Sequence, residues 1–333
     1  MSRRRQQHGV LSVASHAKVV LLVLLPALAA ASAERGTYEL AGRILPGARA
    51  SVSLYGATTP FSTSTLSDTG GRFRFRDLLP GAYTLAVFLP GQGEARRTIE
   101  VGPSLADSRG RVSVTVDLGD SDLISHQALA RRHVAPARQL SVPDPARREF
   151  DQALKKLSRR DVSGAVAHLE RAVHIAPQYA AAWNHLGTIA YQTREYPRAE
   201  SHFRKALERD PEAFEPLVNL GGVLLNLDKG KEALAYNRHA VLSRPNDALA
   251  NSQLGLNYFT LGDLDRAVKH LTHAKRLDPS HFSHPQLTLA EIHLRRQNRP
   301  AAAAELEDFA QRHPDAPQAA KAREAAAKLR AEP

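Results

Sequence analysis

The sequence predicts a multidomain β + α chain in which a small antiparallel β-sandwich is followed by an all-α solenoid of helical hairpins. From about Thr37 to Asp117 apolar residues alternate with polar ones, which is typical of strands with one buried face. Four prolines then recur 34 residues apart, the period of a repeated helix–turn–helix unit; they are Pro177, Pro211, Pro245 and Pro279. A length of 333 residues is also typical of two domains.

Composition narrows the possible functions before any motif is considered. The chain has no cysteine, which excludes disulfides, thiolate metal ligands and a cysteine nucleophile. Its formal net charge is +11, but the basic residues are spread through helices that also carry acids. That distribution is typical of solvated helix faces, so we expect no nucleic-acid partner.

The first 33 residues have the three parts of a secretory signal peptide. A basic start at Arg3–Arg5 precedes an apolar run over Val19–Ala31, and Ala31-Ser32-Ala33 supplies the small residues of a cleavage site. We therefore expect residues 1–33 to be removed and the protein to be periplasmic or secreted. The alternative is an uncleaved membrane anchor, but the run is shorter than the ~20 residues of a spanning helix and contains Pro26.

Residues 34–119 are predicted to form the sandwich. Apolar residues two apart mark the buried faces of its strands; they are Val52 and Leu54, Phe73 and Phe75, Tyr83, Leu85 and Val87, and Val112, Val114 and Val116. Turn clusters separate these strands, and Gly70 and Gly71 can take the positive φ of a tight turn.

The run from Asp68 to Leu85 resembles the carboxypeptidase regulatory-like domain. It contains Gly-x-Phe-x-Phe at Gly71–Phe75 and Pro-Gly-x-Tyr at Pro80–Tyr83, in the order and spacing of that family. The resemblance implies a Greek-key sandwich like the transthyretin fold, which is not itself catalytic and accompanies another functional region in exported proteins. We expect the Tyr83 ring in the core and its hydroxyl on a backbone group.

Residues 120–143 show neither the alternation typical of strands nor the period typical of helices, so they are predicted to be a linker. Within this linker, Leu140–Val142 could form a strand that docks on the sandwich. Helices should begin at residue 144, with Asp144 as the N-cap and Pro145 in the first helical position.

The unit from Trp183 to Pro211 resembles the tetratricopeptide repeat. Gly187, Ala199 and Ala206 place small residues where two helices must touch, and large apolar residues lie one turn away. The resemblance implies five such repeats over residues 144–316, with a more polar first repeat and a degenerate fifth. Residues 317–333 read as an Ala-rich helix that caps the open end.

In the tetratricopeptide family the first helix of each pair lines a concave groove that binds peptides. Amide and aromatic side chains suit this role, because amides bond peptide backbone and rings form pockets. Carried over repeat by repeat, the predicted peptide-binding residues are Asn184, Thr188, Tyr191, Gln192, Asn226, Ser252, Phe259 and Arg295. Leu225 and Phe259 could equally belong to the core between repeats.

Neither metal nor catalytic chemistry is expected. His270-x-x-His273 and His281-x-x-His284 have a spacing that can bind zinc, but no third ligand accompanies them in the sequence, so we expect no metal and no cofactor. There is no His-Glu-x-x-His and no Gly-x-Ser-x-Gly motif, so no catalytic residue and no small-molecule substrate are predicted.

The sequence thus predicts an exported, non-enzymatic scaffold or adaptor with a protein or peptide partner. It would contact a membrane only if the signal segment were retained. The alternative is a carbohydrate- or cell-envelope-binding module that uses the β-sandwich.

Overall fold

The computed structural model describes residues 36–90, 93–118 and 142–331. The predicted signal peptide, its cleavage site and most of the linker, including Leu140, lie outside these ranges. No helix among the described residues combines the length and the apolar character needed to cross a membrane.

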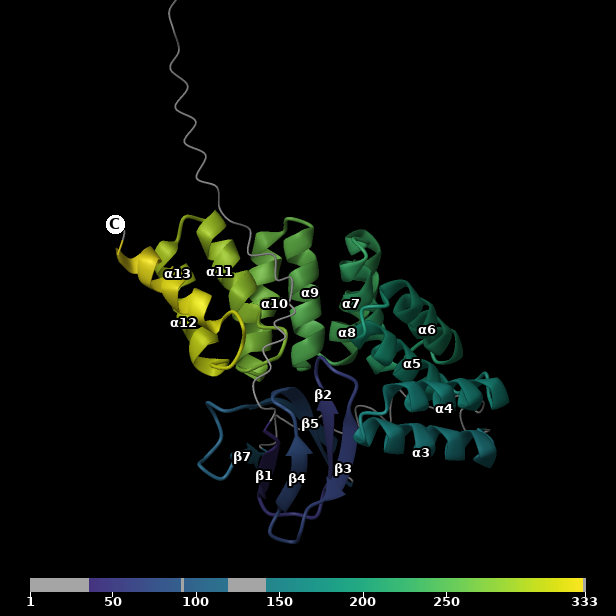
Figure 1. Ribbon diagram of the computed structural model, residues 1–333. Helices are drawn as coiled ribbons and strands as arrows, with labels where there is room; N and C mark the ends of the chain where they lie inside the picture. The colour runs from purple at the N-terminus through teal and green to yellow at the C-terminus, as the bar shows by residue number, and fades with distance from the viewer. Residues whose placement is uncertain (1–35, 91–92, 119–141, 332–333) are drawn as a thin grey trace, which may run out of the picture. The chain divides into compact units, whose positions relative to one another are not determined.

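The first part of the chain is a sandwich of seven strands in two sheets (Figure 1). The strands are β1 (Tyr38–Leu45), β2 (Ser51–Gly56), β3 (Ser62–Leu66), β4 (Arg72–Leu78), β5 (Gly81–Leu89), β6 (Gly93–Val101) and β7 (Arg111–Asp117). One sheet has the order β4-β1-β7 and the other the order β3-β2-β5-β6. The described pairings are antiparallel except that of β1 with β7, which is parallel. A period of two is the same in both directions, so the sequence did not show this pair.

Alternating burial explains why these segments form strands. In β4 the rings of Phe73 and Phe75 are buried while the neighbouring arginines are exposed. The Tyr83 ring packs edge-on against Phe61 (centroids 5.7 Å apart) and its hydroxyl donates to the Leu79 carbonyl (2.7 Å), as the resemblance implied. Of the two turn glycines, Gly71 takes the positive φ (78°), and a Cβ there would lie 2.5 Å from the Ile44 carbonyl oxygen.

Five antiparallel helix pairs and a final helix follow, which confirms the predicted fold class (Figure 1). Their bounds are α3 (Asp144–Ser158), α4 (Val162–Ile175), α5 (Ala180–Gln192), α6 (Tyr196–Arg209), α7 (Phe214–Asn226), α8 (Gly230–Ser243), α9 (Ala248–Thr260), α10 (Leu264–Leu277), α11 (Pro285–Arg295), α12 (Arg299–Arg312) and α13 (Ala319–Ala331). We refer to α3–α13 as the solenoid.

Small residues allow the two helices of a pair to approach closely. Ala199, Phe203 and Ala206 of α6 are fully buried, and Phe203 lies directly over Gly187 of α5. Trp183, expected in the same space, is only partly buried. Its indole N–H donates to the Pro177 carbonyl (3.0 Å), so it packs at the repeat boundary.

Two helix ends differ in detail from expectation. The N-cap of α3 is Pro143, and Asp144 belongs to the first turn without a side-chain cap bond, so the helix begins one residue earlier than predicted. At the other end α13 packs on α12 through Phe309, Ala310, Ala319 and Ala322, as expected of a cap.

Candidate binding site between the sandwich and the repeats

Strand β6 is held against the solenoid by charged and polar contacts. Arg96 Nη2 lies 3.0 Å from Glu215 Oε1 at the start of α7, and Arg244 Nη1 lies 3.2 Å from the same oxygen. Two residues along β6, the Thr98 N–H donates to Asp278 Oδ2 after α10 (2.9 Å). These contacts join a strand of the sandwich to the ends of helices in the third and fourth repeats.

Further contacts extend this interface in both directions. The Gln192 side-chain amide of α5 donates to the Gly56 carbonyl at the end of β2 (2.9 Å). Beyond β6 the Ser104 N–H and hydroxyl both donate to the Asp315 carboxylate (3.1 and 2.5 Å). In the first repeat, the Arg160 guanidinium donates to the Asp77 carbonyl of β4 (3.0 Å), so the sandwich contacts all five repeats.

A cavity of about 650 Å³ lies between the two parts of the chain; we call it the interdomain cavity. Residues of α5, α7 and the loops before α9 and α11 form one wall, and β2, β5, β6 and the segment after β2 form the other. The sandwich side chains that line it include Tyr55, Phe61, Thr84, Arg96, Arg97 and Thr98. Sequence analysis did not find these residues, because nothing local to the sandwich shows which of its surfaces faces the solenoid.

Three of the predicted groove residues line this cavity. Asn184, Thr188 and Gln192 are four residues apart on α5, so they share one face of the helix. The Asn219 amide of α7 adjoins them and donates to Asn184 Oδ1 (3.4 Å). Among the described residues these two amides make no other side-chain hydrogen bond, so together they keep a donor and an acceptor available.

The remaining predicted residues lie on successive first helices but do not line the cavity. The Asn226 amide of α7 donates to the Tyr191 hydroxyl of α5 (3.3 Å). The Arg295 guanidinium of α11 lies 4.5 Å from the centre of the Phe259 ring of α9. The Ser252 hydroxyl is 2.6 Å from that of Ser283. Neighbouring repeats thus pair these side chains with one another.

Leu225 and Phe259 are the two residues for which the sequence allowed either a place in the groove or a place in the core between repeats. Leu225 and Phe259 are partly buried and pack against the apolar clusters between repeats. Each therefore contributes to the core, and Phe259 in addition offers a ring face to Arg295.

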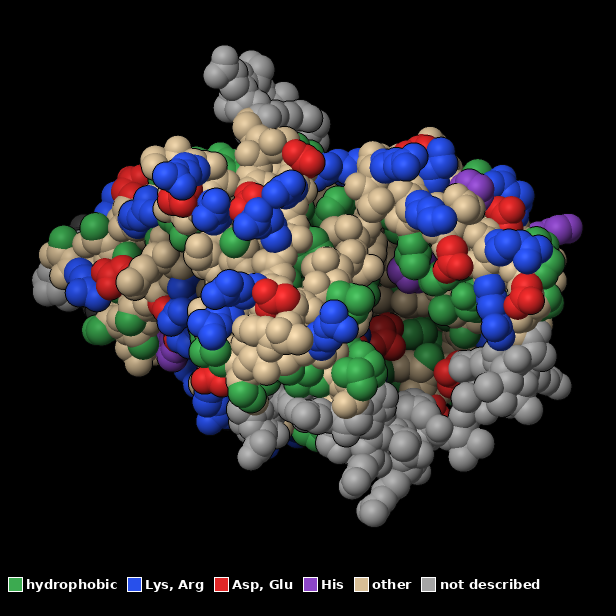
Figure 2. All heavy atoms as spheres, turned by 90° about the horizontal axis from the view of Figure 1, so that it is seen from below, with side chains coloured by type: hydrophobic (Ala, Val, Ile, Leu, Met, Phe, Trp, Pro, Cys, Tyr) green, Lys and Arg blue, Asp and Glu red, His purple; other side chains and the backbone are tan. Residues whose placement is uncertain are grey.

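Charges at the cavity are largely satisfied by the protein itself. Burial opposes ionisation of both Glu215 and Arg96. Nevertheless, Arg96 and Arg244 hold the pKa of Glu215 below its usual value. In the same way, Glu215 and Glu94 hold the pKa of Arg96 above its usual value. Asp247 accepts the Ala250 N–H as the N-cap of α9 (2.8 Å). The adjoining surface mixes Lys and Arg with Asp and Glu (Figure 2).

Buried acid–base groups in the lining are shifted toward their neutral forms, and they include His281, whose pKa burial lowers to about 4. Burial lowers the pKa of His185 to about 4, although Glu215 opposes this shift, so the imidazole is neutral at pH 7. Burial raises the pKa of Asp278, and the hydrogen bonds from Thr98 oppose the rise. The cavity therefore presents amides, the neutral imidazoles of His185 and His281, and apolar surface.

Comparisons with known families match both parts of the chain. Residues 37–117 match the carboxypeptidase regulatory-like domain, and residues 158–278 match the middle TPR-like domain of cilia and flagella-associated protein 70. Over these residues the chain is similar to a carboxypeptidase regulatory-like domain followed by tetratricopeptide-like repeats.

Curated relatives match part of the chain and part of their own length. The human cell division cycle protein 16 homolog is 33% identical over 109 residues, which is 30% of this chain and 18% of that protein. The BBSome complex member BBS4 homolog of Drosophila melanogaster is 25% identical over 120 residues, which is 36% of this chain and 25% of that protein. The chain thus spans a quarter or less of these relatives.

Two solved structures are similar to part of the chain. PilW, described as a widely conserved type IV pilus biogenesis factor, is 21% identical with a TM-score of 0.49, over 57% of this chain and 92% of its own. MamA residues 41-end from Desulfovibrio magneticus RS-1 is 23% identical with a TM-score of 0.47, over 53% of this chain and 99% of its own.

Proposed function

We propose that this chain is a non-enzymatic scaffold that binds an extended peptide segment of a partner protein, with part of that segment held in the interdomain cavity. The observation that carries the proposal is the cavity itself. Its volume of about 650 Å³ falls within the range of ligand pockets, roughly 300–1,000 Å³, and its walls combine apolar surface with a few polar groups.

The polar groups suit a peptide backbone. A backbone offers one donor and one acceptor per residue, and the amides of Asn184 and Asn219 keep one of each available after bonding to one another. The cavity charges are engaged in contacts such as Arg96 with Glu215. Recognition would therefore rest on amide bonds and apolar contact, and binding should depend only weakly on salt.

The first helices of the repeats would give the segment a path beyond the cavity. Tyr191 and Asn226 lie on the same helices as Asn184 and Asn219, and Phe259 follows on α9. Successive repeats thus supply amides for the backbone and rings for side chains. Export through residues 1–33 remains part of the proposal and rests on the sequence alone.

A displayed library of unstructured peptides, selected against the intact chain, provides the ligand for the test. We expect Asn184→Ala and Asn219→Ala each to weaken the selected peptide by roughly tenfold, equal to about 1.4 kcal/mol, because each removes an amide partner. Tyr55→Ala, which removes an exposed ring of the sandwich wall, should weaken binding as well. Isothermal titration in 50 and 500 mM salt measures the loss of affinity in each variant and the dependence of binding on salt.

The matched control is Lys269→Ala, an exposed residue of α10 that does not line the cavity. It should bind like the parent. Loss of binding on Tyr55→Ala with no effect of the two asparagine changes would assign binding to the sandwich and contradict the peptide proposal. Parent-like affinity in all three cavity variants would place the site elsewhere.

A further inference from the structure

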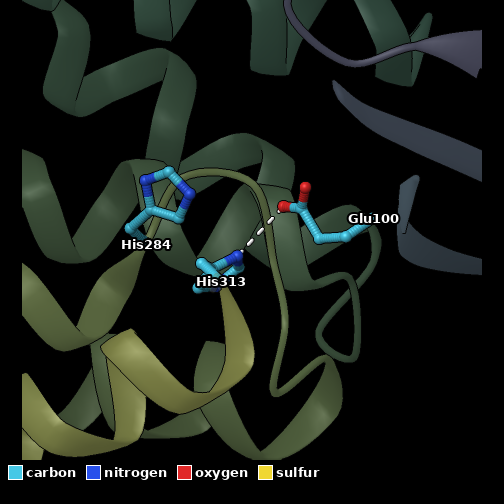
Figure 3. A group of neighbouring side chains, drawn as sticks. All are labelled: Glu100, His284 and His313. Atoms are coloured by element: carbon cyan, nitrogen blue, oxygen red, sulfur yellow. Dashed lines mark hydrogen bonds and ion pairs between the residues drawn. The ribbon is translucent and has the colours of Figure 1, made fainter. Parts of the chain in front are cut away.

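Three potential metal ligands converge where the sandwich meets the fifth repeat. Glu100 comes from β6, His284 is the N-cap of α11, and His313 is the C-cap of α12. One ligand atom from each residue lies within 4.8 Å of the other two (Figure 3). The sequence separates the outer pair by 213 positions, so no motif marked the group.

His313 has an unusual environment for a structural histidine. Its side chain is fully buried, and its Nδ1 lies 3.0 Å from Glu100 Oε1. Its Nε2 is also buried and has no hydrogen-bond partner among the described residues. A buried polar atom without a partner is uncommon in native proteins.

His284 is held beside His313 by its backbone and its ring contacts. Its φ of 50° places it in the left-handed region, which is uncommon for a residue other than glycine. Its ring meets the His313 ring edge-on with centroids 4.4 Å apart and meets the Phe309 ring at 5.0 Å. No hydrogen bond to a His284 ring nitrogen occurs within the described part of the chain, so the ring is placed without a bonding partner of its own.

We propose that Glu100, His284 and His313 bind a divalent transition-metal ion, with Zn²⁺ as the ion that suits them best. One nitrogen of each histidine and one oxygen of Glu100 would be the protein ligands, and water would complete a tetrahedron. Imidazole with a single carboxylate favours zinc over Mg²⁺ and Ca²⁺, which need several oxygen ligands.

The spacing is compatible with this geometry after small side-chain rotations. Ligands about 2.0–2.2 Å from a tetrahedral ion are roughly 3.3–3.6 Å from one another, and the three atoms already lie within 4.8 Å. Binding needs unprotonated imidazoles, so the proton between Glu100 and His313 would leave to solvent as the metal enters.

Such an ion would tie β6 to both ends of the fifth repeat. It lies at the interface between sandwich and solenoid but outside the lining of the interdomain cavity. The proposal therefore does not depend on peptide binding, and either one can fail without the other.

The test uses the intact chain after dialysis against a chelator, titrated with ZnCl2 alone and followed by calorimetry and thermal melting. We expect one equivalent to bind and the melting temperature to rise with metal concentration. Glu100→Gln and His284→Gln should each weaken binding at least tenfold, because each removes a ligand and keeps the side chain's approximate size. These two are preferred over changes at the fully buried His313, which threaten folding.

The matched control is His239→Gln, which removes an exposed histidine paired with Glu212 (3.1 Å) and should bind like the parent. A cobalt titration should give the visible absorption of a four-coordinate ion in the parent and lose it in His284→Gln. Either of two results overturns the proposal: no stoichiometric zinc binding by the parent, or binding by both ligand variants that matches it.

Discussion

At the scale of single residues, the closest helix contacts depend on glycine. A Cβ built on Gly187 would lie 2.6 Å from Phe203 Cε1, and one on Gly221 would lie 1.9 Å from Asn237 Oδ1. Real Cβ atoms do not come this near other atoms, so the facing side chain or the helix would have to move. Gly230, at the start of α8, is different, because its nearest contact would be an ordinary 3.4 Å to Thr260 Oγ1.

Gly187→Ala should therefore lower the free energy of unfolding by about 1–3 kcal/mol, because the added methyl group overpacks the contact with Phe203. Gly230→Ala makes the same chemical change in open space and should be neutral or stabilising by up to about 1 kcal/mol. Urea unfolding at pH 7 measures both. Equal stability of the two variants would disprove the close approach of α5 and α6.

At the scale of elements, side-chain caps begin several of the repeat helices. Asp161, Asp247 and Asp263 each accept a backbone N–H three residues later, and Asn298 does the same at α12. Asp144 does not: it is exposed inside the first turn of α3, after Pro143. The four aspartates have the same side chain, so their position relative to the helix start decides whether they cap.

Asp263→Ala should cost about 1 kcal/mol of stability, since the Arg266 N–H then loses its acceptor (3.1 Å). Asp144→Ala should cost less than about 0.5 kcal/mol, because it removes only a charge near the helix start. Thermal melts of the two variants side by side make the comparison. A larger loss for Asp144→Ala would restore that residue as the cap.

At the scale of the whole described molecule, Glu215 links sandwich and solenoid. Its oxygen Oε1 pairs both with Arg96 of β6 and with Arg244, the C-cap residue of α8. Hydrogen bonds between charged groups are worth about 1.5–3 kcal/mol when shielded, but this carboxylate is 38% exposed, so we expect a contribution below that range.

Glu215→Gln should accordingly reduce stability by about 1 kcal/mol at pH 7. Because the folded-state pKa of Glu215 is depressed, its contribution is present above the ordinary value of 4.5 and is lost as the pH falls through the folded value. The difference from the parent should therefore shrink on acidification. Glu212→Gln is the control: its carboxylate is 59% exposed, so little change is expected, and an equal loss there would argue against a special role for Glu215.

Much of the fold followed from the sequence because it is encoded locally. Alternating residues such as Phe73 and Phe75 place one strand face inside, and small residues such as Gly187 and Ala199 mark helix contacts whatever surrounds them. The spacing of Asn184, Thr188 and Gln192 on one helix face likewise needs only the period of an α-helix.

Tertiary structure alone decided what faces those residues. The second wall of the cavity comes from the sandwich, and Arg96 reaches Glu215 across 119 positions of sequence. The group of Glu100, His284 and His313 likewise arises only when β6 meets the fifth repeat. Hydrophobic periodicity tells each element which side to bury, but it carries no information on which distant surfaces will meet, because that depends on the shape and charge of both domains after they have folded.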